Sequence, residues 1–303
     1  MRLRNPSWLN KELLYKTSIE DINDTVFASI NSRLSKLISD KPVVSVVIAA
    51  YNEQTNIIRC LDSLANAKTK YPIEIVVVDN NSTDKTADVI HKFPAVTYAF
   101  QKIQGCGIAR QLGQETAKGK YILTADADTH YPPKWIDKLM SQLEKPGVVC
   151  VYGRYSFIAD EKTPRWKLTI YETLSDIMGL VKSYKRPYLN ALGMTMGYVK
   201  ELGLKIGFVP EHIRGEDGRM AFDLMKYGRI KGVYSSSARV WTITRTISQD
   251  GRLRDALWKR VLMALANFGD MFRKQADHDT KTSKNSTDNV QENLEKIKGK
   301  FKF

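Results

Sequence analysis

The chain has 303 residues and a formal net charge of +14, with 43% hydrophobic and 26% charged residues. These proportions are typical of a soluble globular protein, and no apolar run approaches the roughly 20 residues needed to span a bilayer. The basic excess suits nucleic acid, an anionic membrane surface or a phosphorylated substrate. Because Lys and Arg are spread along the chain and no nucleic-acid-binding motif occurs, we expect no nucleic-acid partner.

The cysteines and the N-terminal residues indicate where in the cell the protein is expected. Cys60, Cys106 and Cys150 are isolated and lie in or near apolar segments, which is typical of reduced core or near-core thiols in a cytosolic protein. They form no zinc-binding pattern. Because the N-terminal residues also lack the pattern of a signal peptide, we expect a cytoplasmic protein.

The first half of the chain alternates strands and helices. After a helical extension over residues 1–40, a β-branched apolar run at 43–50 predicts a buried central strand. Further strands are predicted at 73–78, 95–100 and 121–125, separated by segments with apolar residues at helical spacing. This order predicts right-handed crossovers and a largely parallel sheet flanked by helices.

The second half is less regular. A helix is predicted after Pro132, a strand at 148–152, an amphipathic helix at 163–185, and a helix after Asp217. The sequence predicts a further helical segment at 246–272. The polar stretch 273–303 has few apolar residues, so we expect it to be disordered.

Two aspartates, Asp126 and Asp128, directly follow the fourth predicted strand. In open α/β sheets, ligands bind beyond the carboxyl ends of the strands. Paired carboxylates there suit a Mg or Mn ion that also contacts substrate phosphates. The alternative is a solvated turn, because Asp is common in turns. His130, two residues further, is expected to be a solvent-exposed loop residue.

The ends of the first two strands could hold a nucleoside. Neither G-x-G-x-x-G nor a phosphate-binding loop follows the first strand, which argues against a dinucleotide site or a nucleotide-hydrolysing loop. Instead Tyr51 could stack on a base, Glu53 could accept from a ribose hydroxyl, and Asp79 could accept from a base N–H. Taken singly, each could equally be an ordinary polar loop residue.

Four motifs taken together resemble glycosyltransferase family 2, whose members are inverting enzymes of the GT-A fold. In chain order they are Val-Val-Ile-Ala-Ala-Tyr-Asn-Glu53, Val-Val-Val-Asp79-Asn-Asn-Ser-Thr-Asp, Gly-Ile-Ala-Arg110-Gln-Leu-Gly and Asp126-Ala-Asp128. The resemblance covers roughly residues 43–245 and implies one catalytic domain over 41–245. That domain would have a Rossmann-like nucleotide-sugar half at 41–150 and an acceptor half at 151–245.

The resemblance also implies roles for single residues on the donor side. Ala50, with Tyr51, Glu53 and Asp79, would line the nucleoside pocket of a nucleotide-sugar donor, most often a UDP-sugar. Arg110 would lie near the phosphates or the sugar, whereas without the resemblance it could be an exposed helix arginine.

The resemblance also implies roles for Asp126, Asp128 and the segment 240–245. Asp126 and Asp128 would serve ribose, diphosphate and a Mg or Mn ion, with Asp128 the more direct metal ligand. The segment 240–245 would lie near the diphosphate.

An inverting transfer needs a proton acceptor beside the acceptor hydroxyl. The family carries an acidic pair in the position of Glu216 and Asp217, and by that resemblance Asp217 would be the base and Glu216 would shape the acceptor site. The alternative is an acidic first helical turn that only favours the helix dipole.

The expected function is therefore metal-dependent, non-processive sugar transfer to a hydroxyl of a glycan or lipid-linked acceptor, as in cell-surface polysaccharide biosynthesis. The polymer-synthase signature Q-x-x-R-W is absent. A polyprenyl-phosphate glycosyltransferase is the main alternative. A sugar nucleotidyltransferase and a non-enzymatic basic binding protein are further alternatives.

The basic helices leave two interpretations open. Trp166, Trp258, Phe268 and Phe272 lie among Lys and Arg residues and could dock on an anionic membrane, which would make the protein peripheral on the cytoplasmic face. The same side chains could instead pack on the domain, and this is the interpretation we favour.

Overall fold

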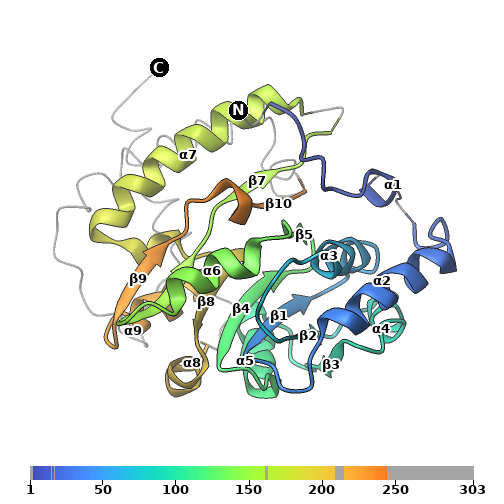
Figure 1. The fold of residues 1–303 in the computed structure, drawn as a ribbon, viewed down its shortest axis with the longest axis horizontal. Helices are drawn as coiled ribbons and strands as arrows, with labels where there is room; N and C mark the ends of the chain where they lie inside the picture. Colours follow the sequence, from blue (N-terminus) through green and yellow to red (C-terminus); the bar gives the residue numbers. More distant parts are fainter. Residues whose placement is uncertain (1–2, 15, 17, 161–162, 209–214, 244–303) are drawn as a thin grey trace, which may run out of the picture.

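The computed structural model describes residues 3–14, 16, 18–160, 163–208 and 215–243. Its centre is a seven-stranded sheet of order β3-β2-β1-β4-β8-β6-β9 (Figure 1). The strands are β1 Val44–Ala50, β2 Ile73–Asp79, β3 Thr97–Phe100, β4 Tyr121–Asp126, β6 Val148–Tyr152, β8 Met196–Val199 and β9 Arg229–Gly232.

The first four strands of this sheet are parallel, as predicted. β1 lies between β2 and β4, and both pairings are parallel over their whole length. β8 pairs antiparallel with both β4 and β6, and β9 pairs parallel with β6, so β8 is the one strand of this sheet that runs against the others. The expected α/β fold with a mostly parallel sheet is thus confirmed.

One face of the sheet is covered by α2 Asp24–Leu37, α3 Asn56–Ala65, α4 Thr86–His91 and α6 Trp135–Leu143. Successive side chains of a strand point to opposite faces of the sheet. Val44, Val46 and Ile48 of β1 therefore lie in the core on this face, whereas Val47 lies in the core on the opposite face. The predicted N-terminal extension therefore includes a helix, α2, that packs into the main core. The short α1 Lys11–Leu14 precedes it.

The opposite face is covered by α5 Cys106–Thr116, α8 Lys200–Ile206 and α9 Glu216–Leu224. α5 approaches β1 closely because Gly113 has no side chain; a Cβ there would lie 2.3 Å from Val47 Cγ1. Cys60 and Cys150 are buried as expected, but Cys106 is exposed at the start of α5, so its interpretation as a core or near-core thiol is wrong.

A second, three-stranded sheet was not predicted. It has the order β5-β10-β7, formed by β5 Thr129–His130, β10 Val240–Thr242 and β7 Tyr155–Phe157. The long helix α7 Arg165–Lys185 runs along this sheet in Figure 1. Short 3-10 turns occupy Pro187–Asn190, Gly193–Thr195 and Ser236–Ala238.

Among the described residues, no helix is long and apolar enough to cross a membrane. The predicted helical segment 246–272 and the predicted tail 273–303 lie outside the described residues. The boundaries assigned to the domain and its halves stay predictions.

Candidate active site

The sheet brings the predicted donor residues to one edge. In the strand registers, Ala50 lies opposite Asp79, and Ala49 lies opposite Asp126. The carboxyl ends of β2, β1 and β4 are therefore neighbours, which is where ligands bind in open α/β sheets. Motifs that are far apart in sequence thus meet at the same edge of the sheet.

The four residues that were predicted to line a nucleoside pocket differ in their surroundings. Tyr51 is 46% exposed and available for stacking, whereas the side chain of Ala50 is buried in the core. Glu53 is buried and accepts a hydrogen bond from Asn56 Nδ2 at 2.7 Å. Asp79 is buried and accepts from the backbone N–H of Ser82 at 3.0 Å. Glu53 and Asp79 thus already orient loops, and their roles toward a nucleoside stay predictions.

Asn52 joins the loops that follow β1 and β2, and sequence reasoning missed it. Its backbone is left-handed, with φ 54°, a conformation that Asn tolerates better than most residues. Its Oδ1 accepts from the backbone N–H of Thr83 at 2.8 Å, and its own N–H donates to Ser82 Oγ at 3.0 Å. A polar residue in a strand-end turn was the available signal, because Asn favours such turns.

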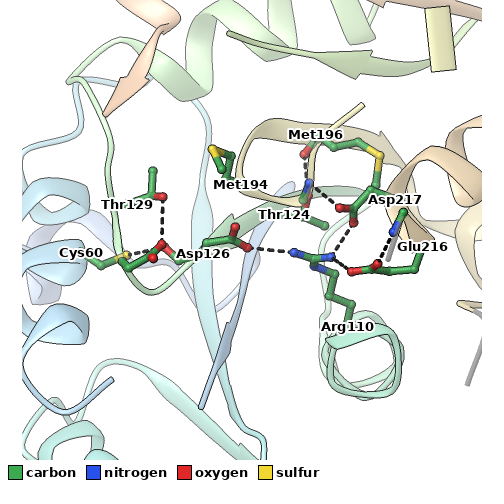
Figure 2. Close-up of polar contacts among 12 residues, drawn as sticks. Cys60, Arg110, Thr124, Asp126, Thr129, Met194, Met196, Glu216 and Asp217 are labelled. Carbon is green, nitrogen blue, oxygen red and sulfur yellow. Dashed lines mark hydrogen bonds and ion pairs between the residues drawn. The ribbon is translucent and has the colours of Figure 1, made fainter. Parts of the chain in front are cut away.

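Arg110 is the centre of the site. This α5 residue is buried, and its guanidinium pairs with Asp126 on one side and with Glu216 and Asp217 on the other (Figure 2). The distances are 2.8 Å from Nη2 to Asp126 Oδ1, 2.7 Å from Nη1 to Glu216 Oε1 and 2.5 Å from Nη1 to Asp217 Oδ1. The interpretation of Arg110 as an exposed helix arginine is therefore wrong.

The charge balance of this cluster is negative. Three carboxylates share one guanidinium, so a full set of ionised groups carries two uncompensated negative charges. Burial, followed by repulsion from Glu216 and Asp126, raises the pKa of Asp217 to about 7 against the lowering effect of Arg110. A carboxyl group with that pKa can accept a proton near neutral pH, as a general base must.

Gly193 completes the surroundings of Asp217. Its backbone N–H donates to Asp217 Oδ2 at 2.8 Å, so both oxygens of this carboxylate are oriented. A Cβ at position 193 would lie only 1.9 Å from Arg110 Nη2. The segment Gly193-Met-Thr195 therefore leaves room for the guanidinium and also supplies a donor to the acid.

The two strand-end aspartates lie in a well-supported turn. Asp126 N–H donates to Tyr131 Oη at 2.8 Å, and the side chain of Asp126 is 30% exposed. Asp128 Oδ1 accepts from Thr129 Oγ1 at 3.4 Å. Within the described ranges, no group of three or more His, Cys, Asp or Glu residues is suited to hold a metal. The hard carboxylate oxygens nevertheless fit Mg or Mn, since such ions usually take further ligands from water and substrate phosphates.

His130 is not the exposed loop residue that was expected. It belongs to β5, is 5% exposed, and pairs in register with Trp241 of β10. Burial, together with the charge of Arg59, lowers the pKa of His130 to about 4, so the imidazole is neutral near pH 7. β5 has only two residues, too few for a hydrophobic pattern to show in the sequence.

The end of β10 contacts the same turn. Thr242 Oγ1 donates to the backbone carbonyl of Asp128 at 3.3 Å, and Thr242 lies opposite Thr129 in the small sheet. The first part of the segment 240–245 therefore lies beside the strand-end aspartates. Residues 244 and 245 lie outside the described residues.

A protein-family model described as glycosyl transferase family 2 matches residues 45–206, more than half of the chain. The chain belongs to this family. The match spans the strand-end motifs, Arg110, both strand-end aspartates and Gly193, but it ends before Glu216 and Asp217.

Similar proteins carry related names. A putative glycosyltransferase EpsH of Bacillus subtilis is 33% identical over 120 residues, which is 38% of this chain and 35% of that protein. A dolichol-phosphate mannosyltransferase of Pyrococcus furiosus is 31% identical over 127 residues, 41% of this chain and 36% of that protein. The matched region thus spans little more than a third of either relative.

Solved structures with the same fold have lower sequence identity. The mannosyltransferase PcManGT of Pyrobaculum calidifontis, in complex with GDP-Man and Mn²⁺, has a TM-score of 0.55 and 18% identity, covering 84% of this chain and 73% of its own. S. aureus TarS 1-349, in complex with UDP-GlcNAc, has a TM-score of 0.51 and 18% identity, covering 84% and 72%. At this identity the likeness shows the fold, which is GT-A.

Proposed function

We propose that this protein is an inverting, metal-dependent and non-processive glycosyltransferase. It moves one sugar from a nucleotide-sugar donor, most simply a UDP-sugar, to a hydroxyl of a glycan or lipid-linked acceptor. We place this activity in the cytoplasm, in the assembly of cell-surface polysaccharide. The observation that carries the proposal is the cluster in which buried Arg110 joins Asp126 at the donor edge to Asp217.

Asp217 is the proposed base. In a single displacement, the acceptor hydroxyl attacks the anomeric carbon, the bond from that carbon to the diphosphate breaks, and the hydroxyl proton passes to Asp217 Oδ. The raised pKa of this carboxyl favours that role, because a base works best when its pKa lies near the operating pH. Glu216, the adjacent acid on α9, shapes the acceptor side.

Arg110 and Gly193 act as positioning residues. Arg110 holds Asp217 Oδ1 and Gly193 N–H holds Oδ2, so the base cannot rotate freely when an acceptor arrives. The same guanidinium reaches Asp126, so the geometry of the base depends on the donor edge. Pre-oriented groups of this kind lower the entropic cost of reaching the transition state.

The donor lies along the edge formed by Ala50, Tyr51, Glu53 and Asp79, with its diphosphate toward Asp126 and Asp128. Those two aspartates would hold a Mg or Mn ion, which when bound stabilises the negative charge that develops on the leaving diphosphate. The PcManGT complex contains GDP-Man and Mn²⁺, and a TarS complex contains UDP-GlcNAc, which supports a nucleotide-sugar donor and a divalent ion.

A polyprenyl-phosphate acceptor is the second candidate. Two similar proteins bear the names dolichol-phosphate mannosyltransferase and dolichyl-phosphate beta-glucosyltransferase. A phosphate acceptor is already ionised and needs little help from a base. Transfer to polyprenyl phosphate that survives Asp217→Asn would favour this candidate over a hydroxyl acceptor.

The test is a donor screen that measures nucleoside diphosphate release from UDP- and GDP-sugars, with Mn or Mg and then with a chelator. We expect one donor to be preferred and the chelator to abolish release. Asp217→Asn should lose release, whereas Asp223→Asn on the same helix, which only breaks ion pairs with Arg219 and Lys226, should retain it. Retained release by Asp217→Asn, or release unaffected by the chelator, would refute the proposal.

A further inference from the structure

α7 presents a row of apolar side chains to the outside of the molecule. Six of them, each 43–86% exposed, follow one another at spacings of 4, 4, 3, 4 and 3 residues, which keeps them on one side of the helix. We call this row the outer stripe: Trp166, Ile170, Leu174, Ile177, Val181 and Tyr184. Soluble proteins rarely expose contiguous apolar patches of this kind, so the outer stripe indicates an interaction surface.

The opposite side of α7 is held to the domain by the two acidic residues of the helix. Glu172 is buried, pairs with Arg165 at 2.6 Å, and accepts a hydrogen bond from Ser156 Oγ of β7 at 2.8 Å. Asp176, one turn further along, pairs with Arg239 Nη2 at 2.7 Å. These contacts fix the rotation of the helix, so the outer stripe faces away from the small sheet and cannot turn inward.

The charged side chains that α7 exposes are basic, because both of its acids face the domain. Lys167 and Lys185 are exposed and lie about five helical turns apart, so they flank the same side of the outer stripe at its two ends. Trp166 was expected to pack on the domain but is 55% exposed, and Tyr184 is 86% exposed. Trp and Tyr next to Lys are typical of segments that lie at the interface between a membrane and water.

This pattern favours an anionic lipid surface over a second copy of the chain. Phospholipid acyl chains accept apolar side chains, while the lipid phosphates attract lysines whose aliphatic stems lie along the apolar surface. The net charge of +14 adds an attraction to an anionic leaflet. A second copy docked stripe to stripe would instead bring lysines together with lysines, and α7 has no outward-facing acid to pair with them.

We propose that the outer stripe of α7 docks on a membrane surface that contains anionic phospholipids, with the helix lying in the plane of the interface. The inference goes beyond the proposed function, and the docking itself does not depend on that function.

α7 is also connected to the acceptor side of the site. The carbonyl of Gly179 accepts a hydrogen bond from Asn190 Nδ2 at 2.8 Å, and soon afterwards the chain reaches Gly193, whose N–H donates to Asp217. A docked α7 is thus joined to the proposed base by a short segment, which suits a lipid-linked acceptor. Only this last point rests on the proposed function.

The first test is flotation of the full chain with vesicles of phosphatidylcholine mixed with phosphatidylglycerol, and with vesicles of phosphatidylcholine alone. We expect stronger binding to the anionic vesicles. Ile177→Glu should weaken that binding by about tenfold or more, because a charge replaces an apolar side chain that enters the lipid. The matched control is Leu204→Glu, since Leu204 is also exposed but lies on α8, at the opposite edge of the molecule (Figure 1).

The flotation assay contains no donor or acceptor, so its result does not depend on whether the protein transfers a sugar. If the original chain does not float with anionic vesicles, or if Ile177→Glu binds them as well as Leu204→Glu does, the proposal is wrong.

A second measurement tests the lysines and leaves the apolar row intact. Lys167→Glu should weaken binding to anionic vesicles about fivefold or more, whereas Lys138→Glu, the same change at an exposed position of α6, should stay within about twofold of the original. Equal effects of the two changes would contradict the proposal. Sedimentation velocity without vesicles tests for a second copy. A dimer that dissociates in Ile177→Glu would overturn the proposal, because protein would then cover the outer stripe.

Discussion

Arg110 Nη1 lies 2.5 Å from Asp217 Oδ1, although the two residues are 107 positions apart in the sequence. The pair connects α5 to α9, the helix that begins with the acidic pair Glu216 and Asp217. Because Arg110 also binds Asp126, the same guanidinium links the strand-end aspartates to the proposed base. Removal of Arg110 would leave these carboxylates without their shared counter-ion, which is costly in a buried cluster.

Arg110→Lys keeps the positive charge but loses the planar fork that serves three carboxylates at once. We expect kcat/KM for donor turnover to fall by about 100-fold or more, since several charge-assisted hydrogen bonds of roughly 1.5–3 kcal/mol each are lost or weakened. Thermal unfolding of the variant shows whether a loss of activity comes from the site or from a loss of stability. If activity is close to that of the original protein while the fold is intact, Arg110 does not position the site.

Gly193→Ala places a methyl group where the Arg110 guanidinium lies, at 1.9 Å from Nη2. The guanidinium is held by three ion pairs and cannot move without breaking them. We expect a loss of turnover comparable to that of Arg110→Lys. The control is Gly179→Ala on α7, where the nearest atom to a new Cβ is Asn190 Oδ1 at 3.4 Å. An active Gly193→Ala enzyme would show that Arg110 has another accessible position.

The pH dependence of turnover should report on Asp217. Only the ionised carboxylate accepts a proton, so kcat/KM should rise with pH and level off above the pKa of about 7. In Asp217→Asn this acidic limb should disappear together with most of the activity. A pH profile that is flat from pH 5 to 8 in the original protein would contradict the assignment.

The free energy of unfolding should fall as pH rises, whereas kcat/KM rises. The folded-state pKa of Asp217 lies above its unfolded value, so folding binds a proton between those two values. The stability from this group is fully present below the unfolded pKa and is lost as pH rises through about 7. Denaturant unfolding at pH 5 and pH 8 should therefore show a smaller loss of stability in Asp217→Asn than in the original chain.

Asn52→Ala removes the acceptor that holds the β2–α4 loop and strains a left-handed backbone position. We expect KM for the donor to rise about tenfold or more, because the lost hydrogen bonds are worth of the order of 1–3 kcal/mol. Asn52→Gly separates the two causes, since glycine adopts the left-handed backbone without strain but lacks the Oδ1 acceptor. If both variants bind donor normally, the loop does not contribute to the nucleoside pocket.

The donor edge of the fold was predictable from the sequence because its signals are local. Apolar runs ended in polar residues at Ala50, Asp79 and Asp126, and parallel strands bring such ends together. The family resemblance rested on the same residues. The short strands β5, β7 and β10 were not predicted, because strands of two or three residues show no periodicity.

The link between Arg110 on α5 and the acidic pair on α9 was not predictable. Glu216 and Asp217 lie 106 and 107 residues from Arg110, and no pattern in the sequence couples them. Gly193 gave a partial signal, since a glycine in a packed segment often marks close approach. What it approaches, a guanidinium, depends on the tertiary arrangement of α5, the turn at Gly193–Thr195 and α9. The burial of His130 was missed because β5 has only two residues, too few to show a hydrophobic pattern.

The role of Asp217 as the base is tested most directly by a comparison of donor affinity and turnover between Asp217→Asn and the original protein. We predict that this variant binds the preferred nucleotide-sugar within about twofold of the original affinity, since the base acts only in the transition state. Release of the nucleoside diphosphate should fall by ~10²–10⁴. Near-normal release at unchanged affinity would contradict the assignment of Asp217 as the base.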